Sequence, residues 1–361
     1  MKTGVANLPL HYGKAPPWLF GRMVKLADAI TTIIMDEYGT QEMLRRLSEP
    51  WWFQSFGCIL GFDWHSSGLT TTVCGALKES FKKNNLLYAV GGKGKASRKT
   101  PNEIITIGEQ LNLTDNKTNS LIYASRLAAK VDNAAVQDGY RLYHHSFFFD
   151  EKGRWAIVQQ GMSFTSNYAR RYHWLSDELQ SFVNEPHTAI CCDITGRTLN
   201  MVASESKEAR KASVDLINDN SLNKFIKTKQ VKNQTSLIDY SDSSFTLSTE
   251  HFPTITEKMI VSLQKFSPSN YEELLAIEGV GPQTIRSLAL ISEIVYGTKA
   301  SWKDPCKFSF AHGGKDGWPY PVNKKIYDRS IKILEDGIKN ARLNEKEKYS
   351  ALRRLKQIIY Q

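Results

Sequence analysis

Residues 140–160 read Tyr-Arg-Leu-Tyr-His-His-Ser-Phe-Phe-Phe-Asp-Glu-Lys-Gly-Arg-Trp-Ala-Ile-Val-Gln-Gln. Two runs rich in aromatic and β-branched residues, 140–149 and 154–160, flank an acidic turn that contains Gly153. This arrangement predicts a β-hairpin. Because side chains alternate between the two faces of a strand, the neighbours His144 and His145 are expected on opposite faces.

Segments with helical spacing surround this hairpin. Apolar residues recur at threes and fours between 22 and 38, and the segment 118–136 also has a helical pattern. The aromatic segment 49–57 is typical of a turn, and the apolar run 58–65 favours a short buried strand. The predicted fold class is α+β: a mixed N-terminal and central domain with a β-hairpin or small sheet, followed by a mainly helical C-terminal domain.

The composition changes along the chain and predicts three parts. Residues 1–215 form the α+β domain and the candidate catalytic region. Residues 216–250 form a linker or a long loop, because the stretch from about 226 is polar and rich in Lys, Asn and Ser. Residues 251–361 form a helical nucleic-acid-binding domain.

The charge balance favours a polyanionic partner. The chain has 47 Lys and Arg against 37 Asp and Glu, a formal net charge of +10, and such a surplus supports nucleic-acid binding. No run of eighteen apolar residues occurs, so no membrane partner is expected. The five cysteines form no Cys-x-x-Cys motif, which favours reduced thiols. These features together predict a cytoplasmic protein.

Residues 271–297 read Tyr-Glu-Glu-Leu-Leu-Ala-Ile-Glu-Gly-Val-Gly-Pro-Gln-Thr-Ile-Arg-Ser-Leu-Ala-Leu-Ile-Ser-Glu-Ile-Val-Tyr-Gly. This stretch resembles the helix–hairpin–helix motif of DNA repair proteins. Glycines let the backbone approach a phosphate, and the free N–H groups at the start of the second helix then face that anion. The alternative is an ordinary helical hairpin with a glycine turn. The residues expected to contact or support contact with nucleic acid are Gly279, Val280, Gly281, Gln283, Thr284 and Arg286.

A second basic element precedes the hairpin of strands. Residues 78–99 contain seven Lys and Arg against one acid, and the middle of this stretch has the composition of a mobile loop. The residues expected to bind a nucleic acid strand here are Lys93, Lys95 and Arg98.

Base-excision glycosylases often carry a helix–hairpin–helix motif, and the match to them is incomplete. Their bifunctional members have a catalytic Lys just after the hairpin, where this chain has Gln283. The Asp that they share has Asn323 as its nearest counterpart, at a spacing that is too long. A glycosylase variant would therefore have to use Asp316 or Asp328.

Chelating side chains gather in the segment around the β-hairpin. A carboxylate and an imidazole beside a basic region are the groups that a divalent-metal phosphodiesterase needs. The sequence predicts a Mg²⁺ or Mn²⁺ site, and the alternative is that each residue is structural, with Asp150 in a hairpin turn. The predicted metal ligands are Asp132, Asp138, His144 and Asp150, and the predicted catalytic residues are Asp138, His144, Asp150 and Gln160. Asp63 and His65 form a secondary candidate, since they follow an apolar run and precede a predicted helix.

Three segments together resemble a prokaryotic, largely archaeal family described as a domain of unknown function. They are the opening Thr3-Gly-Val-Ala-Asn-Leu-Pro-Leu-His-Tyr-Gly-Lys-Ala-Pro-Pro-Trp-Leu, Tyr143-His-His-Ser-Phe, and Trp155-Ala-Ile-Val-Gln-Gln-Gly-Met. The resemblance covers nearly the whole chain and implies no established activity. It implies that the N-terminal two thirds is one integrated domain.

These observations predict a DNA-binding protein that acts as a metal-dependent repair or structure-selective nuclease. The sequence leaves two alternatives open. One is a non-catalytic module that binds DNA or RNA and positions a partner enzyme, and the other is the glycosylase variant.

Overall fold

The computed structural model describes residues 8–10, 15–63, 66–163, 165–192, 194–219, 222, 257–306, 324–341 and 343–359. Within these residues, five strands form one antiparallel sheet in the order β1-β3-β4-β5-β6. The strands are β1 (Tyr88–Lys93), β3 (Arg141–Phe149), β4 (Trp155–Met162), β5 (Ala169–Leu175) and β6 (Ala189–Cys191). Helices precede and follow the sheet, so the predicted α+β class is confirmed.

The predicted hairpin is present as β3 and β4, with Phe149 opposite Trp155 in register. Alternation along β3 places His145, Phe147 and Phe149 on one face of the sheet and His144, Ser146 and Phe148 on the other. Both faces are covered by helices, so β4 and β5 are buried along nearly their whole length.

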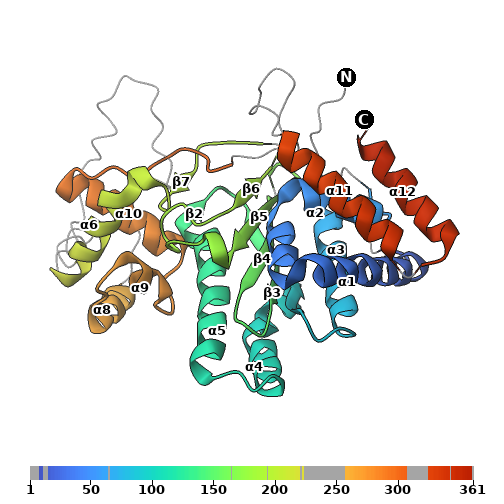
Figure 1. The fold of residues 1–361 in the computed structure, drawn as a ribbon. Coiled ribbons are helices and arrows are strands. Elements are labelled where there is room, and N and C mark those ends of the chain that lie inside the picture. The colour runs from blue at the N-terminus through green and yellow to red at the C-terminus, as the bar shows by residue number, and fades with distance from the viewer. Residues whose placement is uncertain are drawn as a thin grey trace, which may run out of the picture.

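One face of the sheet packs against helices from both ends of the chain. Phe148, Ala156 and Val158 share a core with α1 (Pro17–Ser48), α2 (Pro50–Ile59) and α3 (Gly68–Phe81). The C-terminal helices α11 (Lys324–Asn340) and α12 (Glu345–Ile359) join this same core, through contacts with α1 and α2. Figure 1 shows these last two helices beside the first.

The other face packs against α4 (Thr100–Gln110), α5 (Asp115–Lys130) and the helices that follow the sheet. Those later helices are α6 (Lys207–Asn218), α8 (Glu257–Phe266), α9 (Tyr271–Ala276) and α10 (Pro282–Tyr296) (Figure 1). A two-stranded ribbon of β2 (Val136–Gln137) and β7 (Leu199–Asn200) lies between the sheet and these helices. The described helices of the predicted C-terminal domain are thus divided between two cores. Residues 223–250 of the predicted linker lie outside the described residues.

The aromatic segment that was expected to form a turn is helical. Pro50 occupies the first turn of α2, where its missing N–H costs nothing. Trp52, Phe53 and Phe56 are fully buried because α2 is surrounded by other elements, so its sequence shows no polar face. The expected strand at 58–65 is therefore wrong for its described part, since α2 continues to Ile59 and irregular backbone follows.

The part of the basic stretch that has the composition of a mobile loop forms regular secondary structure. It forms the end of β1 and the 3₁₀-helix η1 (Gly94–Lys99). Glu103 holds the bend, because its carboxylate accepts from the Gly91 amide at 2.7 Å and from Lys78 Nζ at 2.7 Å. Lys93, Lys95 and Arg98 are exposed on this segment.

We expect Gly91→Ala to destabilise the folded state by roughly 2–3 kcal/mol. Gly91 has a φ of +81°, and a Cβ there would lie 2.2 Å from the carbonyl oxygen of His145. Gly94→Ala is the matched control, because its φ is +60° but nothing lies within 4 Å of the new Cβ. The control should lose only about 1 kcal/mol in a urea unfolding measurement. Equal losses in the two variants would contradict the close approach of β1 to β3.

Candidate functional site

A cavity of about 790 Å³ opens between the basic segment, α5, the sheet and the turn that joins α9 to α10. Arg98 of η1 lies on one wall, and Ala276 at the end of α9 and Glu278 in the α9–α10 turn lie on another. The helix α5 contributes Tyr123, Ser125, Arg126 and Lys130, and the sheet contributes Tyr143, His144, His145 and Gln159. The cavity therefore joins two of the predicted regions, the basic segment and the glycine hairpin, to part of a third, the polar cluster.

The glycine hairpin at 279–281 joins α9 to α10. Asn270 caps α9 by accepting from the Glu273 amide at 2.9 Å. Gly279 has a φ of +85°, a conformation that favours glycine, and Val280 is buried in the core. Helix α10 begins after Gly281, which provides no side-chain cap for the amides of the first turn.

The helix α5 holds this hairpin in place. Thr114 caps the start of α5 by accepting from the Lys117 amide at 3.4 Å. At the other end of α5, Lys130 Nζ donates to the carbonyl oxygens of Ile277, at 3.0 Å, and Val280. Next to this contact, Gln137 donates to the carbonyl of Pro282 at 2.8 Å and accepts from Arg286 Nε at 2.8 Å.

The six predicted contact residues of the hairpin are therefore not equivalent. Gly279 and Gln283 are exposed, and Gly281 is half-buried. Val280 and Thr284 are buried, and Arg286 is tied to Gln137. The first group presents surface to a ligand, Val280 and Thr284 support the hairpin from within, and Arg286 is half-buried.

A chain of buried hydrogen bonds forms the base of the cavity. Ser125 Oγ lies 2.9 Å from His145 Nε2, and His145 Nδ1 lies 2.8 Å from Gln159 Oε1. Gln159 is the cross-strand partner of His145, which explains why their side chains share a face. Gln159 Nε2 in turn donates to Asp132 Oδ2.

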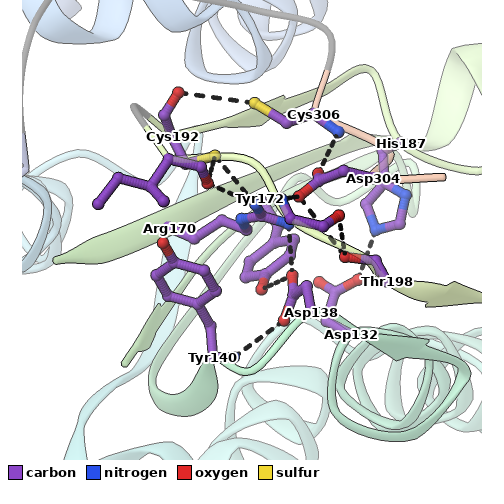
Figure 2. Close-up of polar contacts among 12 residues, drawn as sticks. Asp132, Asp138, Tyr140, Arg170, Tyr172, His187, Cys192, Thr198, Asp304 and Cys306 are labelled. Atoms are coloured by element: carbon purple, nitrogen blue, oxygen red, sulfur yellow. Dashed lines mark hydrogen bonds and ion pairs between the residues drawn. The ribbon is translucent and has the colours of Figure 1, made fainter. Parts of the chain in front are cut away.

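Asp132 lies in η2 (Val131–Ala135), a π-helical turn that extends α5. Its carboxylate is fully buried and accepts from Trp174 Nε1 at 3.1 Å as well as from Gln159. The other oxygen is paired with His187 Nε2, as Figure 2 shows. Asp132 thus links the polar chain that starts at Ser125 to His187.

Asp138 belongs to a separate buried cluster around Arg170 (Figure 2). Its carboxylate accepts from Arg170 Nη1 at 2.9 Å and from the Tyr172 hydroxyl at 2.7 Å. Arg170 also reaches Asp304 at 2.8 Å, which fastens the segment after α10 to the sheet. Burial by itself would lower the pKa of the Arg170 guanidinium, but the neighbouring Asp138 carboxylate raises that pKa, so the arginine stays charged.

Asp150 closes the turn between β3 and β4. One oxygen accepts from the amides of Lys152 and Arg154 at 3.0 Å each, and the other accepts from the Arg154 side chain at 2.6 Å and from Thr40 Oγ1 at 3.1 Å. These contacts match the structural alternative for Asp150 and leave the carboxylate fully occupied.

His144 and Gln160 are cross-strand partners on the face of the sheet that Asp132 does not occupy. His144 Nε2 is 3.0 Å from Ser146 Oγ, and Gln160 Nε2 donates to the Ser67 carbonyl at 2.9 Å and to the Tyr143 hydroxyl. Nδ1 of His144 and Oε1 of Gln160 have no hydrogen-bond partner in the described part of the chain. Burial lowers the pKa of His144 to about 3, so its imidazole is neutral.

The predicted metal ligands and catalytic residues are therefore distributed over four places. Only His144 and Gln160 come together, while Asp132, Asp138 and Asp150 each bind protein partners of their own. No group of three or more His, Cys, Asp or Glu side chains is arranged to hold a metal in the described ranges. The Mg²⁺ or Mn²⁺ site stays a prediction.

The secondary candidates lie away from the cavity or outside the described residues. Asp63 is exposed after α2, and Asp328 is exposed on α11, which packs in the other core. His65 and Asp316 lie outside the described residues.

Ser125 and Arg126 carry no sequence signal of their own. They sit in an ordinary helical pattern, and only the packing of α5 beside β3 brings them to the cavity. The two-residue alternation of side chains along β3 does identify which histidine faces α5, once the side of the sheet that α5 covers is known.

The chain was compared with known proteins. A family model described as "Protein of unknown function (DUF763)" matches residues 4–322. The chain belongs to this family. Searches of the curated proteins and of the solved structures returned no match. The DUF763 match includes the sheet, the cavity and the α9–α10 hairpin, so the site described above lies within the family domain. No helix in the described ranges has the length and apolar character needed to cross a bilayer.

Proposed function

We propose that this DUF763 protein binds nucleic acid, with DNA as the preferred partner, across the cavity and the exposed turn between α9 and α10. One observation carries the proposal. Ala276, the last residue of α9, and Glu278 in the turn border the same cavity as the basic side chains of Arg98, Arg126 and Lys130. A nucleic acid strand that binds across the turn would therefore also contact these basic side chains.

The start of α10 supplies the phosphate contact in this proposal. The amides of its first turn carry the positive end of the helix dipole, and no side chain caps them. Gly279 and Gln283 are exposed there, so a phosphate can approach the backbone closely. Such a contact holds the sugar-phosphate chain and does not read the sequence.

The cavity supplies a place for an unstacked nucleotide. Tyr123 and Tyr143 are on its walls, and aromatic rings are the side chains on which single-stranded bases stack. Lys93 Nζ lies 5.7 Å from the centre of the Tyr143 ring, so a positive charge stands beside that platform. We therefore expect single-stranded or locally unpaired DNA to bind more tightly than a regular duplex.

We expect Gln283→Glu to weaken DNA binding roughly tenfold, because it places a negative charge where the phosphate would lie. An acid in the first turn stabilises a helix, so this variant should keep or raise its melting temperature. Fluorescence anisotropy with a labelled single strand measures the affinity, and calorimetry measures the stability.

Ile294→Glu is the matched control for Gln283→Glu. It makes the same change in net charge on the same helix, at an exposed position near the other end. The control should bind DNA within about twofold of the wild type. Equal weakening in both variants would mean that only net charge matters and would remove α10 from the interface.

Metal-dependent hydrolysis of phosphodiester bonds is the second candidate function. It is favoured by His144, which borders the cavity and whose buried Nδ1 has no hydrogen-bond partner among the described residues. Incubation of flap, mismatched and single-stranded DNA with Mg²⁺ or Mn²⁺ tests it. Cleavage that is inhibited by EDTA and lost in His144→Ala would support this function. If none of these substrates is cleaved, the function is excluded.

The setting that fits these proposals is the cytoplasm. All five cysteines are free thiols, and four of them are buried. A protein that binds nucleic acid must also share a compartment with it. Without hydrolysis, the same interface would serve a module that positions a partner enzyme on DNA or RNA.

A further inference from the structure

The hydrogen-bond chain below the cavity has a defined direction. Asp132 contacts Gln159 through one carboxylate oxygen and His187 through the other, and a carboxylate oxygen only accepts hydrogen bonds. The contact between Gln159 and Asp132 must therefore use the Gln159 NH₂ group as donor, which turns the amide oxygen toward His145. Trp174 Nε1, which is only a donor, fixes the same carboxylate from another strand.

This direction determines the tautomer of His145. Because Gln159 offers an oxygen to Nδ1, the proton of the neutral imidazole sits on Nδ1. Nε2 is then an acceptor, and the Ser125 hydroxyl must donate to it across the 2.9 Å contact. A hydroxyl that donates to an imidazole, whose other nitrogen is held by a third group, is the arrangement of an activated nucleophile.

We propose that Ser125 is a nucleophile, that His145 is its general base, and that Gln159 and Asp132 are positioning residues. Both Ser125 and His145 border the cavity, although each is almost wholly covered by protein. The substrate class is a phosphodiester, because the cavity walls carry Arg98, Arg126 and Lys130. That the phosphodiester belongs to a nucleic acid rests on the proposed function.

The reaction proceeds in two balanced steps. In the first step, Ser125 Oγ bonds to phosphorus, the bond to the leaving sugar oxygen breaks, and His145 Nε2 takes the hydroxyl proton. The departing oxygen takes a proton from solvent. In the second step, a water attacks phosphorus from the side that the sugar left and loses a proton to solvent. The Oγ–phosphorus bond then breaks, and Oγ recovers its proton from His145.

A phosphonofluoridate probe tests the nucleophile in the unmodified full-length protein. Such probes form a covalent bond with activated serines and release fluoride. Peptide mass mapping should find the adduct on Ser125, with or without EDTA. A serine hydrolase that is labelled completely under the same conditions serves as the reference. If the folded wild type then shows no adduct on Ser125, the proposal is overturned.

Two variants identify the source of the reactivity. Ser120→Ala, at an exposed position of the same helix, should label like the wild type. His145→Gln should slow labelling of Ser125 by about 100-fold or more, since a general base contributes that much. Unchanged labelling in His145→Gln would overturn the role of the histidine. A further measurement needs no variant. In the wild type with ¹⁵N-enriched histidine, the ¹⁵N signals of His145 should show the proton on Nδ1.

Asp132→Asn tests the positioning residues. An asparagine can donate to Gln159 and turn its amide around, which would move the His145 proton to Nε2. We expect slower labelling together with this change in the ¹⁵N signal of His145. A labelling rate and a tautomer that both match the wild type would exclude the positioning role.

DNA separates this proposal from the proposed function. A single strand that occupies the cavity should protect Ser125 from the probe at concentrations above its Kd. Labelling of Ser125 in a protein that does not bind DNA would keep the nucleophile and overturn the nucleic-acid substrate. DNA binding without any labelling would keep the interface and overturn the nucleophile.

Discussion

Replacing Arg170 with methionine should destabilise the folded state by roughly 3–5 kcal/mol, as measured by urea unfolding at neutral pH. Methionine retains much of the side-chain volume but none of the charge. Asp138 and Asp304 would lose the guanidinium that they share, and the Asp138 side chain has no access to solvent. A buried carboxylate without its partner is among the most costly changes in a folded protein.

Lys303→Met is the control for this variant. Lys303 pairs with Glu205 at 3.0 Å in the same segment as Asp304, but both side chains of that pair are mostly exposed. Exposed pairs contribute about 0–1 kcal/mol, so the control should stay close to the wild type. A loss after Arg170→Met that is no larger than the control would show that the cluster does not fasten this segment to the sheet.

Acid should destabilise the protein through its buried histidines. Burial lowers the pKa of His144 to about 3 and also lowers the pKa values of His145 and His173. Between pH 6.5 and about 3, His144 is protonated in the unfolded chain but neutral in the folded state. The free energy of unfolding therefore falls as the pH falls. For His144 alone the loss should reach roughly 3 kcal/mol at pH 4.5.

His144→Gln isolates this contribution from that of the carboxylates. Glutamine is neutral at every pH and can still hydrogen-bond Ser146, so the variant should lose less stability than the wild type between pH 6.5 and 4.5. The two free energies of unfolding, measured by urea titration at several pH values, should converge as the pH falls. Parallel curves would contradict a neutral, buried His144.

The central strands were predictable because their pattern is local. The aromatic runs on either side of Gly153 form the hairpin, and strict alternation separates His144 from His145. The turn at 279–281 between two helices was predictable for the same reason, since its glycines and the helical patterns on either side are neighbours in the sequence. The α2 helix was not predictable, because a helix buried on all sides has no polar face to reveal its period.

The polar cluster shows a different limit. Its residues are close in the sequence, yet the structure assigns them to separate partners. Asp138 pairs with Arg170 and through it with Asp304, which lies 134 positions from Arg170. Asp132 reaches Gln159 only because a π-helical turn carries it toward the sheet. Proximity in sequence therefore indicated the region of the site and not the contacts within it.

The salt dependence of DNA binding tests the central claim most directly. The claim is that the α9–α10 turn and the basic wall of the cavity hold a phosphate backbone. If about six phosphates are engaged, the affinity of the wild type for a single strand should fall roughly a thousandfold over a fourfold rise in salt. An affinity that does not change with salt, or no binding at low salt, would contradict it.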